Sequence, residues 1–376
     1  MKTWIVLKKR KLIVLALPTL LTFSHLESLK ANSASDFCPV RSDVVPEILT
    51  MVSEKIRANY KRISTWEGHG DVTIRRIYEG RRARDVFNQN IQDQDVRPSR
   101  LRRLSRATVD FKVDLERDLL YSKSYRQPPK YTNVESGKDL VLASSILRVP
   151  FCTTSVLTSE HCLRCSPSKI EGNSVLSHVA TKQQRSKRSK CGTESVFDPR
   201  RSFIVGGSIW KTLSFVLQDV QEQGRLTIDG HELKVEERSI GDASEYRVQV
   251  PGRVSSDSYV FMTMVFSSAK GLNIVSAQTA DQHGKLLQKG EWEYTQVDAV
   301  YLPSRLMKQN FRPNSGEVMY EKRVYLEDQQ VGRPMPRETF TYKNLGLKNG
   351  DTFVDEILDK QYTYQDGQLV EIDKKP

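Results

Sequence analysis

Apolar residues recur every three or four positions between residues 43 and 63, which predicts an amphipathic helix. Pro46 falls in the first turn of this helix, where a missing N–H is tolerated. A second run with the same spacing predicts another helix that ends near Gly224. The first stripe consists of Val45, Ile48, Leu49, Val52, Ile56, Tyr60 and Ile63, and the second of Ile209, Leu213, Val216, Leu217 and Val220.

Two other segments alternate between apolar and polar residues, which is typical of strands with one buried face. In the first, Trp66, Gly68, Gly70, Val72 and Ile74 share a face. The small glycines on that face predict close approach by another element, for which the first helix is a candidate. The second alternation runs through Val109, Phe111, Val113 and Leu115. One wet and one dry face indicates an antiparallel sheet that is covered on one side.

The last 150 residues are expected to be mostly strands. The segment 259–266 is apolar on both faces, as in a central strand, and His283-Gly284 and Asp366-Gly367 are hairpin signals. Val318, Tyr320, Val324 and Leu326 line one face of another strand. The order is helix, strands, helix, strands, without regular alternation, which argues against a doubly wound parallel sheet. The fold class predicted is therefore α+β.

The N-terminus has the pattern of a secretory signal peptide. Five Lys/Arg between residues 2 and 11 precede an apolar run from Leu12 to Phe23. This run is too short to cross a hydrocarbon core of about 30 Å as a helix. We therefore expect residues 1–35 to be a cleaved leader, and residues 36–376 to be the mature domain of a periplasmic or secreted protein. An uncleaved anchor is the alternative interpretation.

Residues 145–200 interrupt the strand pattern and predict a cysteine-rich, basic insertion. Cys152, Cys162, Cys165 and Cys191 fall within it, whereas the fifth cysteine, Cys38, follows the predicted leader. In an oxidising compartment, four clustered cysteines are most simply two disulfides. Zinc ligation by the same four residues, or unpaired thiols, stay open as alternatives, although the spacing is irregular for zinc.

The chain carries no recognisable catalytic motif. None of its six histidines sits in a His-Glu-x-x-His arrangement, and there is no Gly-x-Ser-x-Gly elbow or phosphate-binding glycine loop. We therefore expect a protein that is not an enzyme, with no cofactor and no catalytic or metal site.

Two stretches resemble the lipoprotein-sorting carrier family (LolA-like proteins): IRANYKRISTWEGHGDVTI, residues 56–74, and GEWEYTQVDAVYLPSRL, residues 290–306. The resemblance implies a curved antiparallel sheet, an incomplete β-barrel, wrapped around two or more helices. It also implies that the cleft between sheet and helices receives an acyl chain or a lipidated partner. Residues expected to line such a cleft are Trp66, Val72, Ile74, Phe111 and Val113.

The net charge of +12 is concentrated in a few segments. Besides the N-terminus, basic runs lie at residues 97–106 and 182–190. Export and the lack of interleaved aromatic residues argue against nucleic acid. An alternative function is therefore that of a structural or adaptor protein whose basic loops contact an anionic lipid or envelope polymer through Arg100, Arg102 and Arg103. We expect a monomer in either case.

Overall fold

The computed structural model describes residues 37–92, 98–143, 151–158, 161–167, 175–181, 197–202, 227–228, 231–255, 258–355 and 358–372. The predicted leader, the basic run at 182–190 and the predicted helix at 209–220 lie outside the described residues.

The first predicted helix is confirmed as α1 (Val45–Lys61), with Pro46 in its first turn. Its predicted apolar stripe forms its buried side. Near the end of the helix, the side-chain amide of Asn59 donates to the carbonyl of Tyr301 at 2.9 Å, and the Tyr301 N–H donates back to Asn59 Oδ1 at 2.9 Å. This reciprocal pair fixes α1 against the strand that contains Tyr301.

The described strands form one 19-stranded sheet and a separate two-stranded hairpin, β10 (Thr227–Ile228) with β11 (His231–Glu232). Every pairing among the described strands is antiparallel except that between β9 and β19. In spatial order the large sheet runs β1 (Cys38–Pro39), β12 (Lys234–Ile240), β13 (Ala243–Ser255), β14 (Ser258–Ser267), β15 (Asn273–Asp281), β16 (Leu286–Val297), β17 (Val300–Phe311), β18 (Val318–Val331), β2 (Thr65–Glu79), β3 (Arg100–Asp114), β4 (Leu119–Arg126), β7 (Phe151–Leu157), β8 (His161–Pro167), β9 (Val175–Thr181), β19 (Thr352–Asp355), β20 (Lys360–Gln365) and β21 (Gln368–Ile372).

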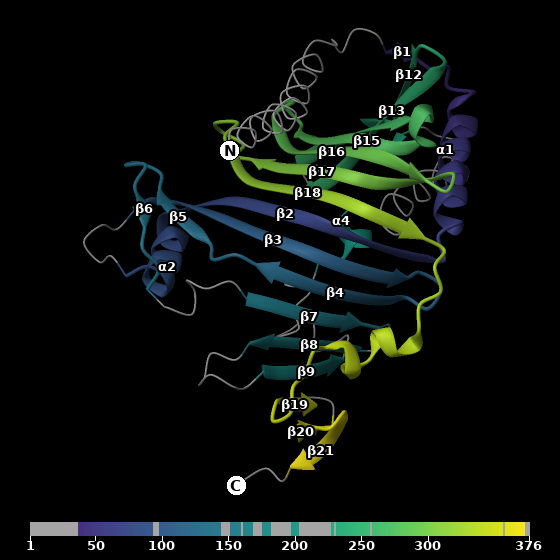
Figure 1. The fold of residues 1–376 in the computed structure, drawn as a ribbon. Helices are drawn as coiled ribbons and strands as arrows, with labels where there is room; N and C mark the ends of the chain where they lie inside the picture. Colours follow the sequence, from purple (N-terminus) through teal and green to yellow (C-terminus); the bar gives the residue numbers. More distant parts are fainter. Residues whose placement is uncertain are drawn as a thin grey trace, which may run out of the picture.

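The sheet is strongly curved, and α1 runs along one side of its upper half (Figure 1). Because its ends are β1 and β21, the sheet is not closed into a barrel. The α+β class and the curved, mostly antiparallel sheet are thus confirmed, whereas the predicted second helix inside the curve falls on residues that are not described.

The register of the central strands determines which side chains share the concave face. Val72 on β2 lies opposite Ala107 on β3 and Val324 on β18. Apolar residues of this face and of α1 form the main core, which includes Trp66, Phe111, Trp292, Leu302, Leu306 and Leu326. The predicted inner face of the first alternation is therefore correct.

The close approach expected at the two glycines of β2 is made by neighbouring strands and not by α1. A Cβ on Gly68 would lie 3.0 Å from the Phe111 ring on β3. A Cβ on Gly70 would lie 2.5 Å from Leu326 on β18. The glycines therefore make room for large side chains that reach across β2 from both sides.

A second helix, α2 (Gly80–Asn90), follows β2 directly and was not predicted. Its Ala83 and Phe87 pack with Tyr78, Leu101 and Tyr131 in a small core of their own. Two short strands, β5 (Lys130–Asn133) and β6 (Asp139–Leu140), complete this unit beside β3. The remaining short helices are α4 (Pro199–Ser202) and the 3₁₀ turns Ser268–Lys270, Arg337–Phe340 and Tyr342–Asn344.

The predicted cysteine-rich insertion is not confirmed as a separate excursion. Its described parts form β7, β8 and β9, which continue the main sheet. Val156, Leu163 and Cys165 of these strands pack against Phe340 and Phe353 in a third core. Because Phe340 lies between β18 and β19, this segment of the chain covers one face of β7 and β8.

Candidate functional site

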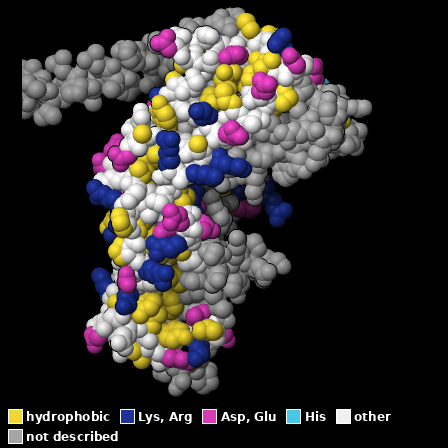
Figure 2. Space-filling view, turned by 90° about the vertical axis from the view of Figure 1, so that its right-hand side faces the viewer, with side chains coloured by type: hydrophobic (Ala, Val, Ile, Leu, Met, Phe, Trp, Pro, Cys, Tyr) yellow, Lys and Arg dark blue, Asp and Glu magenta, His cyan; other side chains and the backbone are white. Residues whose placement is uncertain are grey.

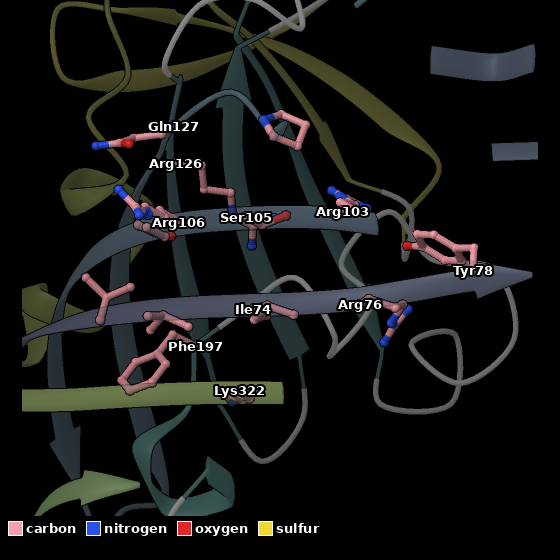
Figure 3. A pocket seen from close by; sticks show the side chains of 15 residues that line it. Ile74, Arg76, Tyr78, Arg103, Ser105, Arg106, Arg126, Gln127, Phe197 and Lys322 are labelled. Carbon is pink, nitrogen blue, oxygen red and sulfur yellow. The ribbon is translucent and has the colours of Figure 1, made fainter. Parts of the chain in front are cut away.

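The concave face has a hollow of about 350 Å³ over β18, β2, β3 and β4, called the first hollow below. Its apolar lining comes from alternate positions of β2 and β3, from Pro129 after β4, and from Phe197, which precedes α4. In Figure 3, Ile74 on β2 lies next to Lys322 on β18 and near Phe197, whereas Arg126 and Gln127 lie beyond β3. The apolar lining residues are Val72, Ile74, Ala107, Val109, Pro129 and Phe197.

Basic side chains share the first hollow with this apolar surface. Arg76, Arg103, Arg106, Arg126 and Lys322 line it, and none of its described lining residues is Asp or Glu. Burial lowers the pKa of the Arg126 guanidinium, and repulsion from neighbouring guanidiniums, including that of Arg103, lowers it further. Gathering like charges in one concavity costs free energy, which an anionic group placed between them would offset.

Lys322 holds the inward position on β18 directly opposite Ile74. Burial lowers the pKa of its ammonium group to about 8, and repulsion from Lys308 acts in the same direction. Asp198 acts in the opposite direction. Lys322 is therefore the one of these cations whose charge changes within an accessible pH range.

A second hollow of about 760 Å³ lies next to the first, over β14 to β18. Arg76 and Lys322 line both hollows, so these two side chains stand where the hollows meet. The described lining of the second hollow again includes five basic residues and no carboxylate. Its basic residues are Arg76, Arg82, Lys289, Lys308 and Lys322, and its apolar ones include Met262, Ala277, Leu306 and Met319.

Two residues that line the second hollow each have a buried polar atom with no hydrogen-bond partner among the described residues. These atoms are Trp292 Nε1, a donor, and Asn310 Oδ1, an acceptor. The Trp292 side chain is held over Gly290, because a Cβ on Gly290 would lie 2.5 Å from Cη2 of the indole. Trp292 is only 7% exposed. A buried indole N–H without an acceptor is unusual in a folded protein.

The structure separates the five residues that were predicted to line a ligand cleft. Val72 and Ile74 line the first hollow. Trp66, Phe111 and Val113 are buried in the main core, where the Trp66 and Phe111 rings meet edge to face with centroids 5.1 Å apart. These three side chains stabilise the fold beneath the hollow.

The predicted anionic-partner residues lie in strand β3 and not in a loop, and they do not form one patch. The Arg100 side chain makes ion pairs with Glu79, at 2.9 Å, and with Glu317. Arg102 is exposed on the same face as Arg100, whereas Arg103 lines the first hollow on the opposite face. Figure 2 shows Lys/Arg and Asp/Glu side chains interspersed on the face that it displays.

The arrangement of the cysteines leaves the disulfide prediction untested in part. Cys152 lies in β7 and Cys162 and Cys165 lie in β8, and no disulfide joins the described cysteines. Cys191 lies outside the described residues. Within the described ranges, no three His, Cys, Asp or Glu side chains converge as metal ligands would.

Of the basic residues in the two hollows, Arg103 was predicted to contact an anionic partner, whereas Lys322 was missed, although the strand pattern contains its signal. The alternation Val318, Tyr320, Val324, Leu326 places Lys322 on the same inward face. Burying a cation on the apolar face of a strand costs free energy, so a lysine at such a position is a candidate for a functional role.

Comparisons with known proteins give no family for this chain. No family model and no curated protein matches it. Among the solved structures that align with it, a DUF1329 family protein from Desulfovibrio piger is 10% identical, with a TM-score of 0.36, and the alignment covers 80% of this chain and 98% of that one. A "putative outer membrane lipoprotein-sorting protein domain" from Vibrio parahaemolyticus is also 10% identical, with a TM-score of 0.34, and the alignment covers 80% of this chain and 99% of that one. No helix in the described part of the chain has the length and apolar character needed to span a membrane.

Proposed function

We propose that this chain is an exported envelope protein that binds an amphiphile, either a lipid or the acyl chain of a lipidated partner, in the first hollow. The acyl chain lies on Val72, Ile74, Val109 and Phe197, and the polar end lies among the basic side chains. The observation that carries the proposal is the presence of apolar strand residues and several cations in one hollow whose described lining has no carboxylate.

The two kinds of lining have different roles in this proposal. Apolar surface at Ile74 and Val109 supplies affinity without orientation, since removing hydrocarbon from water contributes roughly 25 cal/mol per Å². Guanidinium groups at Arg103 and Arg126 supply orientation, because they form directed, charge-assisted hydrogen bonds with anionic oxygens. A volume of about 350 Å³ is within the range of small-ligand sites.

We further propose that the protein binds and does not catalyse, and that it acts in the periplasm or outside the cell after loss of its leader. The N-terminal pattern of basic residues followed by a short apolar run supports export. The adaptor function has less support, because Glu79 and Glu317 already neutralise Arg100, one of its three expected contact residues.

A matched pair of adjacent substitutions tests the site. Ala107 faces the first hollow, and Thr108 is exposed on the other face of β3. In the purified, exported protein, we expect Ala107→Phe to reduce uptake of a fluorescent fatty acid by about tenfold or more, because the ring fills the hollow. Thr108→Phe adds the same ring outside the hollow and should leave uptake close to that of the wild type.

Several outcomes decide against the proposal. Protein that carries no lipid by mass spectrometry and takes up no fatty acid would overturn it. Equal effects of Ala107→Phe and Thr108→Phe would place the ligand elsewhere. If Arg102→Glu abolished binding to an anionic polymer while lipid uptake was absent, the adaptor function would replace it.

A further inference from the structure

We propose that Phe197, held in place by ion pairs of Asp198 and Arg200, closes one end of the first hollow and thereby selects the length of the acyl chain that the protein binds. This inference rests on the proposed function and names the residue that makes the site selective. Phe197 lines the hollow and is 8% exposed. The preferred ligand is therefore an amphiphile whose acyl chain ends at this ring.

The first hollow follows β2 and β3, and its two ends differ in character. Arg76 and Arg103 lie directly opposite each other and line one end. Val72 and Val109 line the other end. An acyl chain whose polar group lies at Arg76 and Arg103 therefore extends along the two strands toward Val72 and Val109, with β18 on one side and β4 on the other.

The Phe197 ring lies where the apolar end of the hollow meets the main core. Its centre is 6.0 Å from that of the Phe111 ring and 6.0 Å from Nζ of Lys322. Lys322 lines the hollow, whereas Phe111 follows Val109 on the inner face of β3 and belongs to the main core. Figure 3 shows Phe197 and Arg76 on opposite sides of Ile74. A chain that extends from Arg76 past Ile74 therefore meets this ring.

Ion pairs fix the segment that carries Phe197. The next residue, Asp198, accepts hydrogen bonds from Nε and from one Nη atom of Arg200, each at 3.0 Å. The same guanidinium pairs with Asp118 in the turn between β3 and β4. The Asp198 and Arg200 side chains are 5% and 16% exposed, and a two-point contact of this kind holds both groups in a defined geometry. The ring that follows from this arrangement is a fixed wall.

A fixed aromatic wall makes affinity depend on chain length. Each methylene group that leaves water for an apolar surface strengthens binding by about fourfold. This gain stops when the end of the chain meets Phe197, because a further methylene must either stay in water or displace a packed ring. We therefore expect affinity to rise with chain length and then to level off or fall.

The test measures how well saturated fatty acids from octanoate to stearate displace a fluorescent fatty acid from the full exported chain. In Phe197→Ala, the length at which affinity stops rising should increase by about two methylenes or more, which raises the affinity ratio of the longer to the shorter acid about tenfold. Phe197→Leu keeps an apolar side chain in the core and should shift the length in the same direction by less. Phe197→Trp enlarges the ring and should shorten the preferred chain.

Two matched controls separate selection from stability. Phe340 is 5% exposed in the third core and is not among the described residues that line either hollow, so Phe340→Leu should keep the chain-length dependence of the wild type. Arg200→Gln loosens the attachment of Phe197 and should flatten the dependence. Arg117→Gln removes the ion pair with Asp114 at the same turn and should leave it unchanged.

The pattern across chain lengths decides the outcome. If Phe197→Ala and Phe197→Leu weakened binding equally for all lengths, or left the dependence unchanged, the inference would be overturned and the proposed function would stay intact. Equal effects of Arg200→Gln and Arg117→Gln would overturn the role of the ion pairs in holding the ring. Absence of binding of every fatty acid to the wild type would overturn the proposed function itself.

Discussion

The indole of Trp292 lies across Gly290, two residues earlier on the same strand, with its Cη2 atom where a side chain at position 290 would begin. We expect Gly290→Ala to cost about 1–3 kcal/mol in unfolding free energy, because the added methyl group must displace the ring. Urea unfolding measures this loss.

Gly252→Ala provides the control for this prediction. A Cβ on Gly252 would meet Val260 at 3.5 and 3.8 Å, which is ordinary van der Waals contact. We expect a change of about 1 kcal/mol or less. If Gly290→Ala and Gly252→Ala behaved alike, the close packing of Trp292 on Gly290 would be refuted.

Lys322 should reduce the stability of the ligand-free protein. Its pKa is lowered to about 8 by burial, so the folded state holds the proton less tightly than the unfolded chain does. Stability should therefore rise as the pH increases from about 8 toward the usual lysine value of about 10.4. Lys322→Met should increase the unfolding free energy at pH 7 by about 1–3 kcal/mol and remove this pH dependence.

The same lysine should make ligand binding depend on pH. Its charge faces Lys308 on β17, Asp198 before α4, and Arg76 on β2. Loss of the Lys322 proton between pH 7 and pH 9 should weaken binding of an anionic amphiphile such as dioctanoyl phosphatidylinositol by about tenfold, since the phosphodiester of this lipid keeps its charge over this range. Lys322→Arg should give binding that is independent of pH. A pH dependence that persists in Lys322→Arg would assign it to another group.

Asn59 should be essential for the attachment of α1 to the sheet. Its side chain satisfies both the N–H and the carbonyl group of Tyr301. Asn59→Leu leaves both backbone groups without partners, so we expect a loss of about 2–4 kcal/mol in thermal or urea unfolding. Lys55→Ala, at an exposed position of the same helix, should change stability by about 0.5 kcal/mol or less. Similar effects of the two substitutions would show that the reciprocal hydrogen bonds contribute little.

The parts of the fold that sequence analysis predicted have strong local periodicity. The stripe of α1 and the alternation at Trp66–Ile74 each identify their own buried side without knowledge of a partner. Helix α2 was missed because its only buried residues are Ala83 and Phe87, which is one apolar pair among polar neighbours. So short a stripe has too little periodicity to separate a helix from a loop.

The candidate site was harder to predict, because it depends on pairing between distant strands. Arg100–Arg106 looks like a uniformly basic run in the sequence, but strand β3 sends alternate residues to opposite faces. The pairing of β2 with β3 places Arg103 directly opposite Arg76, and this pairing brings the two guanidinium groups to the same hollow. Lys322 joins them because β18 pairs with the other edge of β2, although the two strands are about 250 residues apart in the chain.

This pairing of β2 with β18 also limits the order in which the molecule can fold. Strand β2 is made early in synthesis, yet its second neighbour, β18, ends only at Val331. Contacts of such high sequence separation slow folding, since a long loop must close before they form. The centre of the sheet therefore lacks β18 while most of the polypeptide is being synthesised. A chain that stopped at Phe311 would leave the unpaired edges of β2 and β17 open to aggregation.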